Sequence, residues 1–225
     1  MTMTKVSKRI AKVGVGLALL AGFGFLFLRS LRGSRGEPYT IPSDSVGPWS
    51  LATVSGAGPG EPMLVLRPPR MLVNNLFGQL FKRTMESMGE PAAPGIPVVL
   101  QDELTRALAG HPALTPEALL AAARQAGLDA ASPKPLCIAH RRAPDGRERQ
   151  QVFFAIFDLP AFGQFRQHLA AQWNSGIAPK AFDPARLSPA LIIATVESTT
   201  ESWLPLSPDP KVDCIASIAI SSASQ

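Results

Sequence analysis

The chain has 225 residues, of which 46% are apolar and 17% are charged. This composition supports one folded domain with an appendage and excludes a wholly disordered chain. The formal charge of +5 is unevenly placed, because seven of the 22 Lys and Arg residues lie in the first 36 positions, which hold no acidic residue. The remaining 15 basic and 17 acidic groups nearly cancel, so the composition of the domain does not indicate binding to nucleic acid.

An uncharged apolar run near the N-terminus predicts a membrane anchor. Sixteen uncharged residues, Val13 to Leu28, lie between Lys12 and Arg29. As a helix this run is about 24 Å long and the wider stretch 10–31 about 33 Å, against a hydrocarbon core of roughly 30 Å. We therefore predict a transmembrane anchor at residues 13–31, with the lipid bilayer as a partner through residues 10–31.

The flanking residues predict the topology of this anchor. Residues 1–12 form a short basic tail, which we expect to remain in the cytoplasm while the domain is translocated. In a bacterium this orientation gives a single-pass protein of the inner membrane with a periplasmic or extracellular domain. A cleaved signal peptide is the alternative, but the run ends in bulky residues and Arg29, without a small-x-small cleavage site.

The segment after the anchor is rich in Gly, Pro and Ser, so we predict a tether at 32–48 followed by a folded domain at 49–225. Short apolar segments at 49–54 and 63–66 indicate a hairpin. Three glycines between them, Gly56, Gly58 and Gly60, lack the spacing of a phosphate-binding loop and favour a turn.

Three helices are predicted before residue 130. Apolar residues recur with helical spacing from Leu72 to Met88, and we interpret this stripe as facing the core, with a helix lying on a membrane surface as the alternative. Segment 115–126 has a capping threonine, a proline in the first turn and a glycine after its end. A shorter helix is expected from Leu100 to Leu108.

Beyond Pro133 the apolar period changes to that of strands, which we predict at 136–142, 151–157, 190–197 and 212–220, with a helix from Pro160. This order predicts an α+β domain with a mostly antiparallel sheet packed on helices, resembling a ferredoxin-like split βαβ arrangement. The strands at 151–157 and 190–197 are apolar on both faces. Either the chain itself or a partner must therefore cover the second face.

Motifs for catalysis are missing from the sequence. The three histidines belong to no metal-ligand spacing, and no G-x-S-x-G sequence is present. Cys137 and His140 are three residues apart on a predicted strand, so their side chains face opposite sides and do not suit a thiolate–imidazole pair. We therefore expect no catalytic residue, no cofactor and no metal site, and the chain is not predicted to be an enzyme.

One cluster of basic residues stands out within the domain. The cluster lies on the predicted hairpin and consists of His140, Arg141, Arg142, Arg147 and Arg149. Such a surface suits an anionic ligand, a phospholipid headgroup or an acidic partner. The alternative is a solvated hairpin tip whose charges discourage edge-to-edge association.

Cys137 and Cys214 are the only cysteines, and both lie on predicted strands. In an oxidising compartment they can form one disulfide if their strands are adjacent or facing. The alternative is two separate cysteines that act as small apolar side chains. The apolar alternation from Val212 to Ile220 predicts that Cys214 faces inward.

These features together predict a membrane-anchored accessory, scaffold or interaction subunit of a cell-envelope assembly, with another membrane or envelope protein as its partner and no role for nucleic acid. A membrane-tethered ligand-binding or sensory domain is the alternative. A bound small molecule or a deep polar pocket favours the alternative, and a co-purifying membrane protein favours the subunit.

Overall fold

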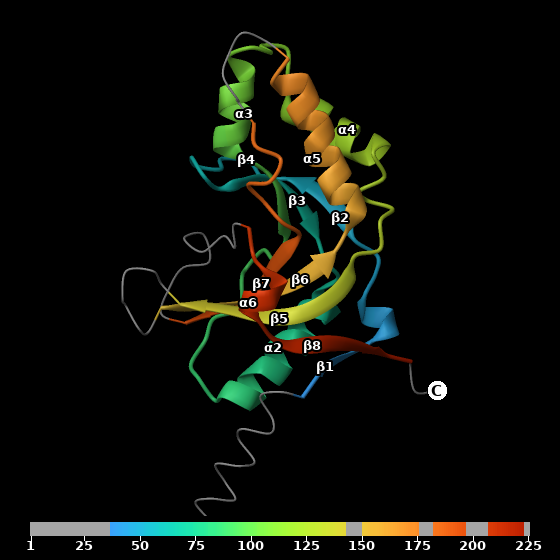
Figure 1. Ribbon diagram of the computed structural model, residues 1–225, viewed down its shortest axis with the longest axis vertical. Coiled ribbons are helices and arrows are strands. Elements are labelled where there is room, and N and C mark those ends of the chain that lie inside the picture. Colours follow the sequence, from blue (N-terminus) through green and yellow to red (C-terminus); the bar gives the residue numbers. More distant parts are fainter. Residues whose placement is uncertain (1–36, 143–149, 176–181, 197–206, 223–225) are drawn as a thin grey trace, which may run out of the picture. The chain divides into compact units, whose positions relative to one another are not determined.

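The structure is a computed structural model, and it describes residues 37–142, 150–175, 182–196 and 207–222. The predicted tail and anchor at 1–31 lie outside these residues. The chain divides into two units, Met1–Glu37 and Pro38–Gln225, and the second is the folded domain. It has a mixed α+β fold (Figure 1).

Eight strands and five α-helices are present in the described part of the domain. The strands are β1 Tyr39–Pro42, β2 Ser50–Thr53, β3 Pro62–Arg67, β4 Ile96–Leu100, β5 Lys134–Arg142, β6 Gln151–Asp158, β7 Ala190–Val196 and β8 Cys214–Ser221. The helices are α2 Arg70–Thr84, α3 Gln101–Leu108, α4 Pro116–Gln125, α5 Pro160–Trp173 and α6 Pro210–Asp213, with a 3₁₀ turn η1 at Ser43–Ser45.

The strands form two sheets. The larger has the order β1-β8-β5-β6-β7, in which only the β1–β8 pair is parallel. The smaller has the antiparallel order β2-β3-β4. In Figure 1, α3, α4 and α5 gather around the smaller sheet, whereas α2 packs beside the larger one.

The ferredoxin-like arrangement is therefore wrong, although the α+β class is confirmed. That arrangement requires β3 in one sheet with β5, β6 and β7, but β3 pairs with β2 and β4 instead. The sequence pattern did not reveal β4, because all five of its residues are buried and a strand buried on both faces shows no alternation. With β4 present, β3 completes a separate sheet.

The predicted tether is also too long, because its second half belongs to the domain. Tyr39 and Ile41 of β1 are 2% and 0% exposed, and β1 forms the edge of the larger sheet. The outward N–H and C=O of Thr40 are bonded to the side-chain amide of Gln79 in α2, at 3.0 and 2.6 Å. The helix thus satisfies the free edge of β1, which would otherwise be open to another strand.

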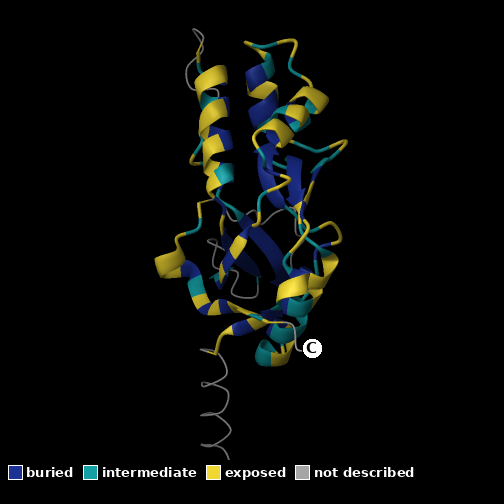
Figure 2. Ribbon diagram, turned by 90° about the vertical axis from the view of Figure 1, so that its right-hand side faces the viewer, coloured by how far each residue is buried: buried dark blue, intermediate teal, exposed yellow. Residues whose placement is uncertain are grey.

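The apolar core is continuous from one sheet to the other. Its main cluster contains residues of both sheets and of α2, α4 and α5. A second, smaller cluster lies on the opposite face of β5, β6 and β7 and includes Cys137, Phe154 and Ile192. Both faces of β6 and β7 are thus buried within the chain itself, and Figure 2 shows these strands in dark blue.

Helix α2 differs from its prediction at the C-terminal end. Leu72, Val73, Leu76 and Leu80 are buried, as expected for a core-facing stripe. The helix stops at Thr84, however, and Met85 is 76% exposed. The stripe therefore turns away from the core in its last turn.

Candidate interaction surfaces

The described members of the basic cluster predicted on the β5 hairpin do not all share one face of the sheet. Its first three members stand at the end of β5, and Arg147 and Arg149 lie outside the described residues. His140 and Arg141 are neighbours on a strand, so their side chains face opposite sides of the sheet. Arg142 is exposed at the end of the strand.

His140 is held by neutral and aromatic contacts. Its imidazole stacks on Phe153, with ring centroids 4.6 Å apart, and its Nε2 is 2.7 Å from Oε1 of Gln151. Partial burial lowers the pKa of His140 below its ordinary value, and this effect outweighs the opposing hydrogen bond to Gln151. These contacts favour the uncharged ring, which is a poor ligand for an anion.

Arg141 is bound within the domain. Its Nε and one terminal nitrogen donate to the two carboxylate oxygens of Asp213, at 2.9 and 2.7 Å, and it also donates to the carbonyl of Ser207. The hydrogen bonds from Arg141 lower the pKa of Asp213, and those same bonds raise the pKa of Arg141. The charge of Arg141 therefore fixes α6 against β5 and is already compensated.

Cys137 and Cys214 form a disulfide in the structure, with Cα atoms 5.8 Å apart. The residues are close because β5 and β8 are adjacent. A bulge between the two strands makes Ile138 face Ala216 and Ala139 face Cys214. Simple alternation would place Cys214 with Ala216 on the main core face, but the bulge moves it to the smaller cluster beside Cys137.

The prediction that Cys214 faces inward with Val212 is therefore wrong in detail. Val212 lies in α6 and is 78% exposed, and Cys214 is only partly buried. Asp209 caps this short helix by accepting from the backbone N–H of Lys211, at 2.9 Å. The strand begins only after that turn, at Cys214.

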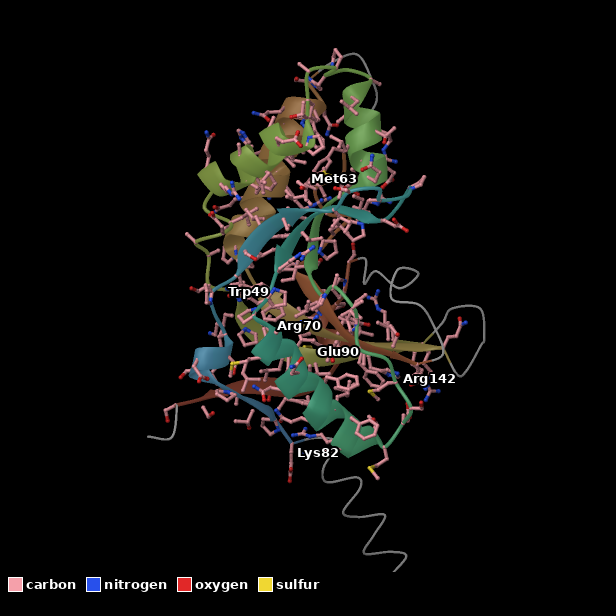
Figure 3. The ribbon with its side chains drawn as sticks, turned by 180° about the vertical axis from the view of Figure 1, so that it is seen from behind. Trp49, Met63, Arg70, Lys82, Glu90 and Arg142 are labelled. Carbon is pink, nitrogen blue, oxygen red and sulfur yellow. A yellow bond between two sulfur atoms is a disulfide. The ribbon has the colours of Figure 1, made fainter. Side chains whose placement is uncertain are left out.

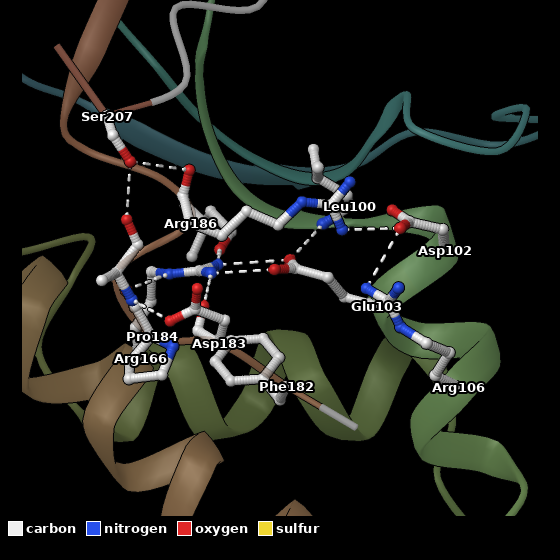
Figure 4. Close-up of polar contacts among 12 residues, drawn as sticks. Leu100, Asp102, Glu103, Arg106, Arg166, Phe182, Asp183, Pro184, Arg186 and Ser207 are labelled. Atoms are coloured by element: carbon white, nitrogen blue, oxygen red, sulfur yellow. Dashed lines mark hydrogen bonds and ion pairs between the residues drawn. The ribbon is translucent and has the colours of Figure 1, made fainter. Parts of the chain in front are cut away.

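The strongest polar site was not recognised from the sequence. Arg166 of α5 and Glu103 of α3 are both fully buried, and their side chains make two parallel contacts of 2.8 and 3.2 Å. Arg166 also donates to the carbonyls of Val98, Asp183 and Pro184, so all five of its N–H groups are used (Figure 4). Glu103 in turn accepts from the backbone N–H of Leu100, at 3.0 Å.

This network has the character of a structural support. Neither charged group is accessible, and every donor of Arg166 is satisfied. The guanidinium also lies 4.4 Å from the ring centre of Phe182. The sequence signal was Arg166 itself, a charged residue on the helix face that carries Phe162, Phe165 and Leu169.

One hollow in the described surface is large enough for a ligand group or a side chain of a partner. Its volume is about 410 Å³. Its lining is mostly apolar and comes from loop 91–95, from Val54, Pro62 and Val65, and from Ile192 of β7, with Glu61 and Arg67 as the charged members. The loop approaches β3 closely at Gly95, because a Cβ at this position would lie 3.2 Å from the Cβ of Val65.

The turn beside this hollow agrees with the sequence interpretation. Gly56 and Gly60 have φ values of +73° and +85°, which are readily adopted only by glycine. Glu61 donates its N–H to the carbonyl of Gly58. The glycines therefore shape a turn between β2 and β3.

Among the described residues, no group of three or more His, Cys, Asp or Glu side chains is arranged to hold a metal ion. Within the same residues, no helix combines the length and the apolar character needed to cross a bilayer. Comparisons with protein-family models, with curated proteins and with solved structures find no match to this chain.

Proposed function

We propose that the protein is a single-pass, membrane-anchored accessory or interaction subunit of a cell-envelope assembly that acts without catalysis. The observation that carries this proposal is the uncharged run from Val13 to Leu28, followed after a few residues by a folded domain that begins at Pro38. A run of this length suits a single crossing of the bilayer. The domain is then fixed within a short distance of the membrane surface.

The proposed topology has the N-terminus in the cytoplasm and the domain in the periplasm or outside the cell. The short basic tail supports this orientation. The disulfide between Cys137 and Cys214 supports it independently, since such bonds persist in oxidising compartments.

The hollow beside loop 91–95 is the surface that we assign to a protein partner. It offers an apolar lining with one carboxylate and one guanidinium, a combination that suits an apolar side chain flanked by polar groups. The hollow is not the deep polar pocket expected of a ligand-binding domain, but its mostly apolar lining suits an apolar small molecule, and a domain that binds such a molecule is the second candidate. The two candidates differ in what co-purifies with the protein.

Two measurements test the anchor. The full-length protein is expected to remain in the membrane fraction after an alkaline carbonate wash, whereas a truncation beginning at Glu37 is expected to be soluble and folded. A truncation beginning at Trp49 is the informative comparison, because it removes β1 and the buried Tyr39 and Ile41. We expect it to aggregate or to unfold at lower urea. Release of the full-length protein by carbonate would contradict the proposal.

The partner is tested by purification of the full-length protein in mild detergent, followed by identification of the chains that accompany it. A matched variant, Ala93→Glu, places a charge at an exposed position in the lining of the hollow. Loss of a specific membrane or envelope protein from this variant supports the subunit. A co-purifying small molecule, and no such protein, would favour the ligand-binding candidate.

A further inference from the structure

The last turn of α2 exposes large apolar side chains. Phe81, in the last turn of the helix, is 47% exposed, and Met85, the first residue after the helix, is 76% exposed. Lys82 is exposed between them. We refer to these three residues as the α2 tip, which lies at the end of the helix marked by Lys82 in Figure 3.

The conformation of Met85 is unfavourable for its side chain. Its φ is +56° and its ψ is +23°, the left-handed conformation that usually belongs to glycine or asparagine after a helix. A Cβ in this conformation is crowded by its own backbone. Met85 gains little core packing in return, so the stability of the domain does not explain a large apolar residue at this position.

The α2 tip is fixed to the point at which the chain enters the domain. Arg83 donates to the carbonyl of Pro38, at 2.8 Å, and its guanidinium lies 4.0 Å from the ring centre of Tyr39. Gln79, one turn earlier in α2, binds the backbone of Thr40. The C-terminal part of α2, which carries the α2 tip, therefore lies beside the first residues of the domain.

Little chain separates this point from the predicted anchor. The anchor ends at Leu31, and only residues 32–37 precede Pro38. The seven residue steps from Leu31 to Pro38 extend by no more than about 25 Å even when fully stretched. For an anchor that crosses the bilayer, so short a connection allows the α2 tip to reach the lipid headgroups.

We propose that the α2 tip docks on the bilayer, with Phe81 and Met85 entering the headgroup region and Lys82 binding lipid phosphate. This proposal rests on the anchor proposed above. Apolar side chains beside a basic residue are the combination that favours the membrane interface. Docking would orient the domain and leave the hollow beside loop 91–95 for the partner.

The test uses full-length protein reconstituted in vesicles of phosphatidylethanolamine and phosphatidylglycerol. A polarity-sensitive fluorophore is attached at Met85→Cys or, as a matched control, at Met71→Cys, which is 54% exposed at the other end of α2. The wild-type chain, labelled in parallel, measures the reaction of the native cysteines. We expect a blue shift and quenching by spin-labelled lipid at position 85 and neither at position 71.

A second set of variants keeps the label away from the docking side chains. The label is placed at Ser87→Cys, an exposed position two residues beyond Met85, and Phe81→Ser and Met85→Asn are added together. Asparagine accepts the left-handed conformation, so this change is expected to preserve the helix end. We expect the quenching at position 87 to be lost in the combined variant and to be retained when Met71→Asn is added instead.

The outcomes separate the two proposals. Protein that stays in the vesicles through carbonate, but whose label at position 85 is as exposed to water as that at position 71, overturns the docking and leaves the anchor intact. Protein that carbonate releases overturns the anchor, and the docking with it.

Discussion

Arg166 and Glu103 form a two-point ion pair in which neither side chain has any exposed surface. The pair joins α5 to α3, and the three further carbonyls that Arg166 binds belong to β4 and to the segment before β7. Removing two charges from water is expensive, and full hydrogen bonding of both groups offsets that cost. The arrangement thus joins the consecutive elements β4 and α3 to α5 and to the segment before β7, which come more than 50 residues later in the chain.

Removal of one member of the Arg166–Glu103 pair should strongly destabilise the domain. Glu103→Gln keeps the shape of the side chain but leaves the Arg166 charge buried without compensation. We expect it to lower the free energy of unfolding by about 3–5 kcal/mol, measured by urea unfolding of the truncation beginning at Glu37. Arg106→Ala is the control, since it removes an exposed ion pair with Asp102 and should cost under about 1 kcal/mol. Equal effects of the two variants would contradict a structural role for the buried pair.

Elements with local signals were predicted well from the sequence. For α4, the Thr115 hydroxyl accepts from the N–H of Ala118 at 3.1 Å, and Gly127 after the helix has a φ of +74°. Both signals depend only on residues within one or two turns. The strands β5, β6 and β7 were likewise visible from their apolar residues.

Elements defined by distant partners were missed. Strand β1 has four residues, and it pairs with β8 near the other end of the chain, where Tyr39 faces Ile218. The proline in β1 and the short length of the strand are typical of a tether unless that partner is known. The bulge that moves Cys214 to the other face of β8 is also a property of the pairing. Periodicity along one strand contains neither piece of information.

The basic cluster shows that a binding site, like a strand, is hard to predict when it depends on partners that are distant in sequence. Sequence proximity grouped His140, Arg141 and Arg142, but the strand separates adjacent side chains between its two faces. The partner of Arg141 is Asp213, which is far away in sequence. Local charge counting therefore could not distinguish a compensated arginine from an exposed one.

This distinction predicts unequal effects for neighbouring arginines. Arg141→Ala leaves the carboxylate of Asp213, whose side chain is 8% exposed, without its ion pair. We expect a loss of about 1–3 kcal/mol in the free energy of unfolding. Arg142→Ala, at an exposed position, should change it by less than about 0.5 kcal/mol. Urea unfolding of the two variants compares them directly, and a similar small change in both would show that the Asp213 contact contributes little.

The pH dependence of stability should contain a contribution from His140. Its pKa is lowered in the folded state from an ordinary value of 6.5, so protons bind the unfolded chain more tightly. The contribution is fully present above pH 6.5 and is lost as the pH falls through the folded pKa. His140→Gln should flatten the fall in stability just below pH 6.5, whereas His168→Gln, at an exposed helix position, should retain it. Thermal unfolding from pH 5 to 8 measures the effect, and a parallel fall in all three proteins would exclude His140 as its source.

The last prediction concerns the disulfide between Cys137 and Cys214, which closes a span of 77 residues. Loss of this constraint frees the unfolded chain, and the chain-entropy estimate for such a loop is about 4 kcal/mol. We expect Cys137→Ser, Cys214→Ser and the double variant to be destabilised by similar amounts, because each removes the same bond. The bond itself is checked by thiol labelling of denatured, unreduced protein from a fresh extract, in which we expect no free thiol. Two reactive thiols per chain would exclude the bond in the cell and would weaken the proposed location outside the cytoplasm.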